Sequence, residues 1–181
     1  MKRISILCAL VALACTSLFA NPNIVPIGGS KYARLSEDKT FISTGDYKTG
    51  NEDTLLVFSK MRVNPLDSVE AFLFSPDGNR ILLRASFENY YVYKIESRRS
   101  DKLSAIDTQS KPMFSPDGKK IAFVRRHNIY VKRLEYDTEV VVTEDGSESV
   151  YNGLRSPEFE KAFGTDVTME WSPDGMYLLY T

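Results

Sequence analysis

Short apolar runs alternate with turn signals along most of the chain. Runs such as Thr54–Phe58, Arg80–Ser86, Tyr90–Ile95 and Ile129–Leu134 have five to seven residues and include many aromatic and β-branched side chains. Gly, Pro, Asn and Asp separate them, which is typical of β-strands joined by tight turns. The exception is near 157–163, where Pro157 precedes a short polar and aromatic run and Gly164 follows it, so a short helix is predicted there.

One turn sequence occurs three times, each time after an aromatic residue. The copies are Phe74–Gly78, Phe114–Gly118 and Trp171–Gly175, each containing Ser-Pro-Asp-Gly and each followed by an apolar run. Proline presets φ at the second turn position, Asp tolerates the third, and Gly supplies the positive φ from which the return strand leaves. Three such units form an internal repeat.

The repeat predicts an all-β fold, a partial β-propeller of about two and a half blades of four antiparallel strands. Blades are expected at about 70–108, 110–146 and 167–181, within one incomplete propeller domain at 21–181. The preceding part is expected to hold an irregular leader at 21–31 and a first hairpin at Tyr32–Tyr47. A propeller closes a ring of four to eight blades, so the sequence predicts a fragment of a longer protein, or a homo-oligomer or other edge-pairing partner.

The first twenty residues predict a secretory signal peptide at 1–20. Lys2 and Arg3 precede the apolar run Ile4–Ala14, and Ala20 precedes Asn21-Pro22 at the expected cleavage site. The product is therefore expected in the periplasm or outside the cell. An alternative is lipid attachment at Cys15, although Ala12 stands where such sites usually carry a branched residue.

The composition of the chain after cleavage excludes several kinds of chemical site. The two cysteines, Cys8 and Cys15, lie in the leader, so the exported chain has no thiol for a disulfide, nucleophile or zinc site. Its few paired basic residues do not form a patch suited to nucleic acid. No metal or cofactor site is predicted.

An ordered set of landmarks resembles the N-terminal propeller of the dipeptidyl peptidase IV family of secreted serine peptidases. The set comprises Tyr47–Gly50, Leu55–Phe58, Phe74–Leu83, Tyr91–Tyr93, Phe114–Arg125, Asn128–Lys132, Thr143–Gly146, Tyr151–Gly153 and Glu170–Gly175. The resemblance covers nearly all of the chain after the leader. It implies a propeller that caps an α/β-hydrolase domain carrying a Ser-Asp-His triad.

No catalytic residue is predicted in this chain. The sequence has no Gly-x-Ser-x-Gly motif, and Gly28-Gly29-Ser30 lacks both its final Gly and its strand-turn-helix context. His127 is the one histidine and is predicted to be a surface residue of a hairpin connection.

The resemblance also implies a site for a peptide substrate's free amino group, held in the family by consecutive glutamates on a short helix. The matching stretch here is Glu160-Lys161-Ala162, which keeps one glutamate, and Glu158 lies nearby. Glu160 and Glu158 are therefore the candidate binding residues, with solvated helix side chains as the alternative interpretation. The link from Arg84 to Tyr90 is shorter than the aromatic and basic arm often present in the family.

Three hypotheses follow. The chain is the N-terminal propeller of a dipeptidyl peptidase IV-like enzyme, inactive alone and acting on peptide substrate only as part of the full enzyme. Alternatively, it is a non-enzymatic binding module similar to TolB-type propellers, or a truncated remnant without function.

Overall fold

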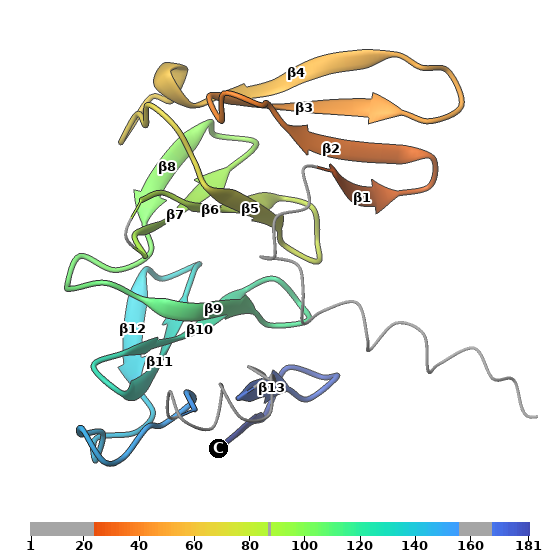
Figure 1. The fold of residues 1–181 in the computed structure, drawn as a ribbon. Helices are drawn as coiled ribbons and strands as arrows, with labels where there is room; N and C mark the ends of the chain where they lie inside the picture. The colour runs from red at the N-terminus through yellow and green to blue at the C-terminus, as the bar shows by residue number, and fades with distance from the viewer. Residues whose placement is uncertain (1–23, 87, 156–167) are drawn as a thin grey trace, which may run out of the picture.

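The chain folds into four antiparallel sheets. The computed structural model describes residues 24–86, 88–155 and 168–181. Within them there are sheets of four, four, four and two strands, here sheets A to D, and one 3₁₀ turn, η2 (Phe58–Lys60). Figure 1 shows the sheets stacked in chain order from top to bottom, as successive propeller blades are. The predicted all-β propeller fold is confirmed, while the helix predicted near 157–163 lies outside the described residues.

Within each sheet, strands that follow one another in the chain pair with each other, so each sheet is a simple meander. Sheet A contains β1 (Ile24–Gly28), β2 (Lys31–Leu35), β3 (Phe41–Asp46) and β4 (Glu52–Val57). Sheet B contains β5 (Ala71–Phe74), β6 (Arg80–Arg84), β7 (Tyr90–Lys94) and β8 (Arg99–Lys102). Sheet C contains β9 (Ser110–Phe114), β10 (Lys120–Arg125), β11 (Asn128–Arg133) and β12 (Thr138–Val141). Sheet D contains β13 (Met169–Trp171) and β14 (Leu178–Tyr180).

Sheet A is a complete four-stranded sheet where the sequence predicted an irregular leader, a hairpin and one further strand at Thr54–Phe58. The segment interpreted as irregular because of Pro26 is strand β1, which pairs with β2 alone. Proline lacks the N–H that a central strand would need, but an edge strand tolerates this loss. The structure therefore adds a third full sheet to the two that were expected.

The repeated turn has the same hydrogen bonds in all three copies. The hydroxyl of Ser75, Ser115 or Ser172 donates to the aspartate two residues later, at 2.5–2.6 Å. The same oxygen accepts from the N–H five residues later, at 2.9 Å in each copy. The turn glycines have φ of +71°, +69° and +66°, as the sequence predicts.

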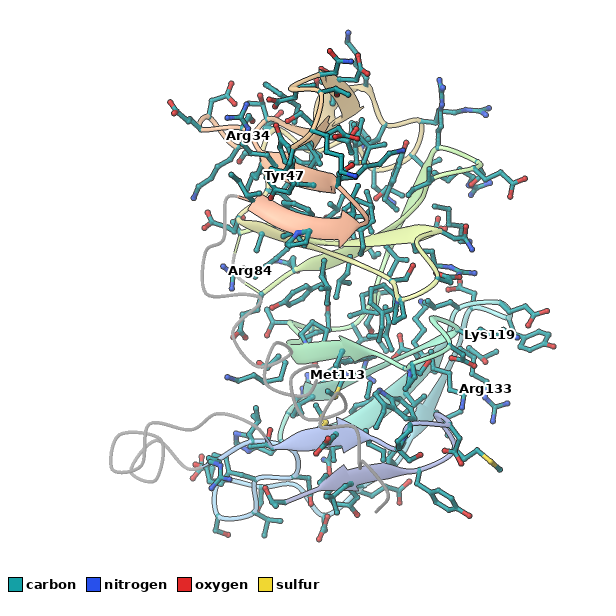
Figure 2. The ribbon with its side chains drawn as sticks, turned by 90° about the vertical axis from the view of Figure 1, so that its right-hand side faces the viewer. Arg34, Tyr47, Arg84, Met113, Lys119 and Arg133 are labelled. Atoms are coloured by element: carbon teal, nitrogen blue, oxygen red, sulfur yellow. The ribbon has the colours of Figure 1, made fainter. Side chains whose placement is uncertain are left out.

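Basic side chains connect these turns from one sheet to the next. Arg80 directly follows the first turn, and its Nη1 lies 3.5 Å from the carbonyl oxygen of Gly118 in the second turn. Lys120 leaves the second turn, and its Nζ donates to the carbonyl of Gly175 in the third at 2.8 Å. Figure 2 shows Lys119 and Arg133 at this edge of sheet C, which is the edge that carries the turn.

The core lies between the sheets in three clusters. Residues of sheets A and B surround Phe58 and Ile81, and residues of sheets B and C surround Leu82 and Phe123. A smaller cluster, with Val124, Ile129 and Met169 at its centre, joins sheet C to sheet D. Sheets B and C each contribute to two of these clusters, so their central strands are apolar on both faces.

We expect Ser115→Ala to lower the free energy of unfolding by about 1–3 kcal/mol. The hydroxyl is completely buried, and its loss leaves the Lys120 N–H without this acceptor. Urea unfolding followed by far-UV circular dichroism measures the change. Ser149→Ala, at an exposed hydroxyl, is the matched control, and equal stability of the two variants would contradict the role given to the turn.

The lowered pKa values of the turn aspartates predict that the folded protein loses stability in acid. Hydrogen bonds from the Ser115 hydroxyl and the Lys119 N–H hold the pKa of Asp117 below its ordinary 3.8, and Ser172 and the Met176 N–H do the same for Asp174. A lowered folded-state pKa stabilises the fold above pH 3.8, and this stabilisation is lost as pH falls through the folded-state values. Urea midpoints should therefore fall most steeply below about pH 4. Asp117→Asn should flatten that decline, and an unchanged pH profile in this variant would refute the assignment.

Candidate functional site

The loops that follow the second and fourth strands of sheets B and C gather at one edge of the stack, opposite the repeated turns. Their described parts are 85–86, 88–89, 103–109, 126–127, 142–155 and 168. Neighbouring loops are hydrogen-bonded: Gln109 N donates to the carbonyl of Glu88 at 3.1 Å, and Ser110 Oγ donates to the Glu88 carboxylate at 2.9 Å. The alternation of antiparallel strands places these loops together, and we call this the loop edge.

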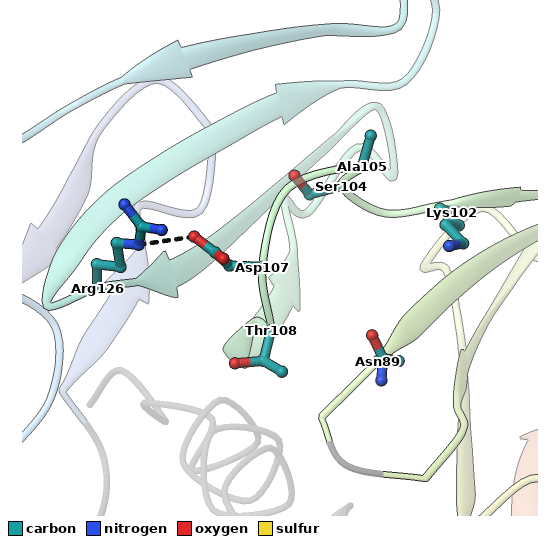
Figure 3. Close-up of a pocket in the computed structure, with 7 residues that line it drawn as sticks. All are labelled: Asn89, Lys102, Ser104, Ala105, Asp107, Thr108 and Arg126. Carbon is teal, nitrogen blue, oxygen red and sulfur yellow. Dashed lines mark ion pairs between the residues drawn. The ribbon is translucent and has the colours of Figure 1, made fainter.

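A cavity of about 500 Å³ opens at the loop edge between sheets B and C. Figure 3 shows its polar lining: Asn89, Lys102, Ser104, Ala105, Asp107, Thr108 and Arg126. Arg126 Nε lies 2.7 Å from Asp107 Oδ2, and this ion pair joins the β10–β11 turn to the β8–β9 loop. The lining has charges of both signs, two hydroxyl groups and one side-chain amide, so it suits a polar peptide backbone better than an apolar ligand.

A buried arginine fixes the wall behind this cavity. Arg125 Nη1 donates to Ser104 Oγ at 2.7 Å and to Glu139 Oε2 at 2.9 Å. Its guanidinium carbon lies 3.9 Å from the centre of the Tyr130 ring. The guanidinium charge is paired with Glu139 and stacked on Tyr130, and these contacts compensate the free-energy cost of burying it. The hydrogen bond from Arg125 also holds Ser104 in place.

The turn between β10 and β11 has unusual backbone geometry. Arg126 and His127 have φ of +48° and +61°, the conformation of a two-residue hairpin that usually contains Gly or Asn. The His127 ring lies 4.5 Å from that of Tyr151, and its carbonyl accepts from Asn152 N at 3.1 Å. His127 is thus half-buried in a structural turn, and no carboxylate or nucleophile is among its contacts in the described part of the chain.

The start of the 142–168 connection is held by Asn128. Its Oδ1 accepts from Thr143 Oγ1 at 3.1 Å and from Gly146 N at 2.8 Å. A Cβ on Gly146 would lie 2.4 Å from the carbonyl oxygen of His127, so the chain passes against this turn where only glycine fits. This close approach explains the Thr143–Gly146 landmark.

Gly153 holds the segment that precedes residues 156–167. With φ of +68°, it packs so closely on the sheet C–sheet D cluster that a Cβ would lie 2.9–3.0 Å from side chains of Met169, Ile129 and Val124. Its N–H donates to the carbonyl of Thr181 at 2.9 Å, and its carbonyl accepts from the hydroxyl of Thr168. Both described ends of the connection are therefore bound to the same part of sheet D.

The predicted binding residues Glu158 and Glu160 lie outside the described residues. The short link from Arg84 to Tyr90 lines a second, smaller cavity with Glu70, at about 340 Å³. Burial raises the pKa of Tyr90 at the end of this link, although the charge of Arg84 opposes the shift.

The described residues hold no group of three His, Cys, Asp or Glu side chains arranged to bind a metal. The same part of the chain has no helix long and apolar enough to cross a membrane.

A family model described as "Dipeptidyl peptidase IV (DPP IV) N-terminal region" matches residues 67–181. The chain belongs to the dipeptidyl peptidase IV family. Dipeptidyl aminopeptidase B of Saccharomyces cerevisiae is 30% identical over 159 residues, which are 81% of this chain and 17% of the yeast protein. A probable dipeptidyl-aminopeptidase B of Chaetomium globosum is 23% identical over 85% of this chain and 17% of its own length. The chain thus spans about a sixth of these relatives.

Solved structures agree with this family assignment. The crystal structure of Porphyromonas gingivalis dipeptidyl peptidase 4 is 29% identical, with a TM-score of 0.78 over 98% of this chain and 27% of that one. The tricorn protease, at 14% identity and a TM-score of 0.60, shares the fold. The match to the dipeptidyl peptidase IV N-terminal region favours the peptidase-propeller hypothesis over a TolB-type module.

The cavity residues were missed by sequence analysis. Lys102 ends β8, and Ser104 and Asp107 lie in the loop that follows it, inside the blade predicted at about 70–108. Asp107 and Arg126 both have positive φ, and neither residue type signals this conformation reliably. The available signal was the two-residue spacing of the Arg126-His127 hairpin, which places Arg126 at the loop edge.

We expect Gly153→Ala to destabilise the chain by about 1–3 kcal/mol more than Gly50→Ala. Both glycines have φ near +70°, so both variants share the backbone cost. Only Gly153 has side chains within 4 Å of the added Cβ. Urea unfolding of the two variants isolates the packing contribution, and equal losses would contradict the close packing at the sheet C–sheet D seam.

Proposed function

We propose that this chain is the substrate-admitting propeller of a dipeptidyl peptidase IV-type enzyme, with Glu160 and Glu158 binding the free α-amino group of a peptide. The observation that carries this proposal is the 142–168 connection, which lies within the family-matched region and is bound at both ends to the propeller. A carboxylate held on such a frame can bind an ammonium by charge-assisted hydrogen bonds.

The cavity at the loop edge supports the same proposal. It opens on the edge from which the 142–168 connection leaves, and its lining offers hydroxyl, amide and charged groups to a peptide chain. A peptide held by its amino terminus near Glu160 would meet these groups with its following residues. The propeller thereby contributes orientation, while bond cleavage belongs to the hydrolase domain that the family resemblance implies.

The proposal also includes export of the protein from the cytoplasm. The leader at 1–20 supports secretion into the periplasm or beyond, where extracellular peptides are the available substrates. Lipid attachment at Cys15 would instead keep the same domain at a membrane surface.

Binding of a peptide should depend on its free amino group. We expect a fluorescent X-Pro peptide to bind about ten-fold more tightly than its N-acetylated counterpart, because acetylation removes the charge that Glu160 pairs with. Glu160→Gln should abolish this difference, and Glu148→Gln, an exposed acidic site on the same connection, should preserve it. Fluorescence anisotropy measures both affinities, and equal binding of the two peptides to the unsubstituted chain would reject the proposal.

A further inference from the structure

The outermost strand of sheet C differs from those of sheets A and B. On β4 and β8 the side chains that reach solvent are mostly polar or charged, which protects the edge of a sheet from pairing with other chains. These residues are Glu52, Asp53, Thr54, Arg99, Asp101 and Lys102. On β12 and directly after it, Val140, Val141 and Val142 are 42%, 45% and 42% exposed.

The one carboxylate within β12 does not protect this edge. Glu139 turns inward to Arg125, at 2.9 Å, and its side chain is 24% exposed. Val140 and Val141 of the strand, with Val142 after it, therefore present three consecutive exposed β-branched side chains, with no outward charge among them. Such a segment has high propensity to pair with another strand.

The backbone of β12 is also available along its outer side. Val142 N donates to the carbonyl of Ile129, so the polar groups of Val142 face β11. Antiparallel alternation then directs the N–H and C=O of Val141, which is opposite Tyr130, away from the sheet.

Acidic side chains lie at both ends of the apolar strand. Glu135 and Asp137 precede it, Glu144 and Asp145 follow it, and all four are exposed. A second copy paired antiparallel about Val141 would place Asp137 opposite Asp145, and like charges opposite one another destabilise a sheet. An apolar strand with lysine or arginine at its ends would instead complement the strand and its acidic flanks, of which Asp137 already pairs with Lys132 Nζ at 2.8 Å.

We propose that β12 is a docking edge for an extended peptide segment with β-branched residues at its centre and basic residues at both ends. The segment adds as a fifth strand to sheet C and hydrogen-bonds to the outward backbone groups of Val141. The site is on the outer rim, separate from the loop edge, and its partner need not be a substrate.

The test uses two synthetic peptides and the full chain. The first peptide has alternating Val and Thr, with two lysines at each end, and the second has glutamates in place of the lysines. We expect the lysine peptide to bind at least about ten-fold more tightly by fluorescence anisotropy, with affinity falling as salt is added. Failure of the lysine peptide to bind, or equal binding of both, overturns the proposal.

Variants then localise the binding. Val141→Pro removes the outward N–H without removing a bond to β11, and Val141→Lys adds a positive charge to the same edge. Each substitution should weaken binding of the lysine peptide at least about ten-fold. Thr54→Lys adds the same charge to exposed β4 and should leave binding unchanged. Circular dichroism verifies that each variant is folded.

Two results would refute the assignment to β12. One is peptide binding that survives both Val141 variants. The other is sedimentation showing that the chain is a dimer which Val141→Lys converts to monomer, because the occupant would then be a second copy.

Discussion

The hydrogen bonds of the serine hydroxyl in the repeated turn are the interaction on which the described fold depends. In each copy one serine oxygen bonds both the aspartate side chain and a backbone N–H, so the return strand starts in a fixed register. Arg80 and Lys120 then connect one turn to the next, because each directly follows its own turn and its side chain contacts the glycine carbonyl of the following turn. The turns therefore set both the hairpins and the spacing between sheets.

A rigid turn edge allows the opposite edge to carry irregular backbone. Arg126, His127 and Asp107 all have positive φ, a conformation that costs free energy in residues with a side chain. The cost is offset by contacts that hold these loops: the Arg126–Asp107 ion pair, the Asn128 hydrogen bonds and the contact of His127 with Tyr151. The result is a frame in which a long connection leaves and returns at fixed points.

The fold was largely predictable because its signals are local. Each Ser-Pro-Asp-Gly turn determines its own hairpin, and the apolar runs around it fill the spaces between sheets. Strand β1 was missed because Pro26 excludes a central strand but not an edge strand, and sequence alone does not reveal which position a strand takes. The cavity was missed because Lys102, Asp107 and Arg126 come from three separate elements and meet only when sheets B and C stack. The candidate glutamates Glu158 and Glu160 were identified only through the resemblance to the family, because no local sequence pattern distinguishes them from ordinary solvated side chains.

One carboxylate links the loop edge to the outer rim. Glu139 would protect β12 if its charge were exposed, as that of Asp53 is on β4. It instead neutralises Arg125, which in turn holds Ser104 in the cavity wall. Removing Glu139 from that pair would leave a buried guanidinium without its counter-ion, which costs far more free energy than an exposed valine edge. The support of the cavity therefore requires an inward charge on β12, and the exposed strand is a consequence of this requirement.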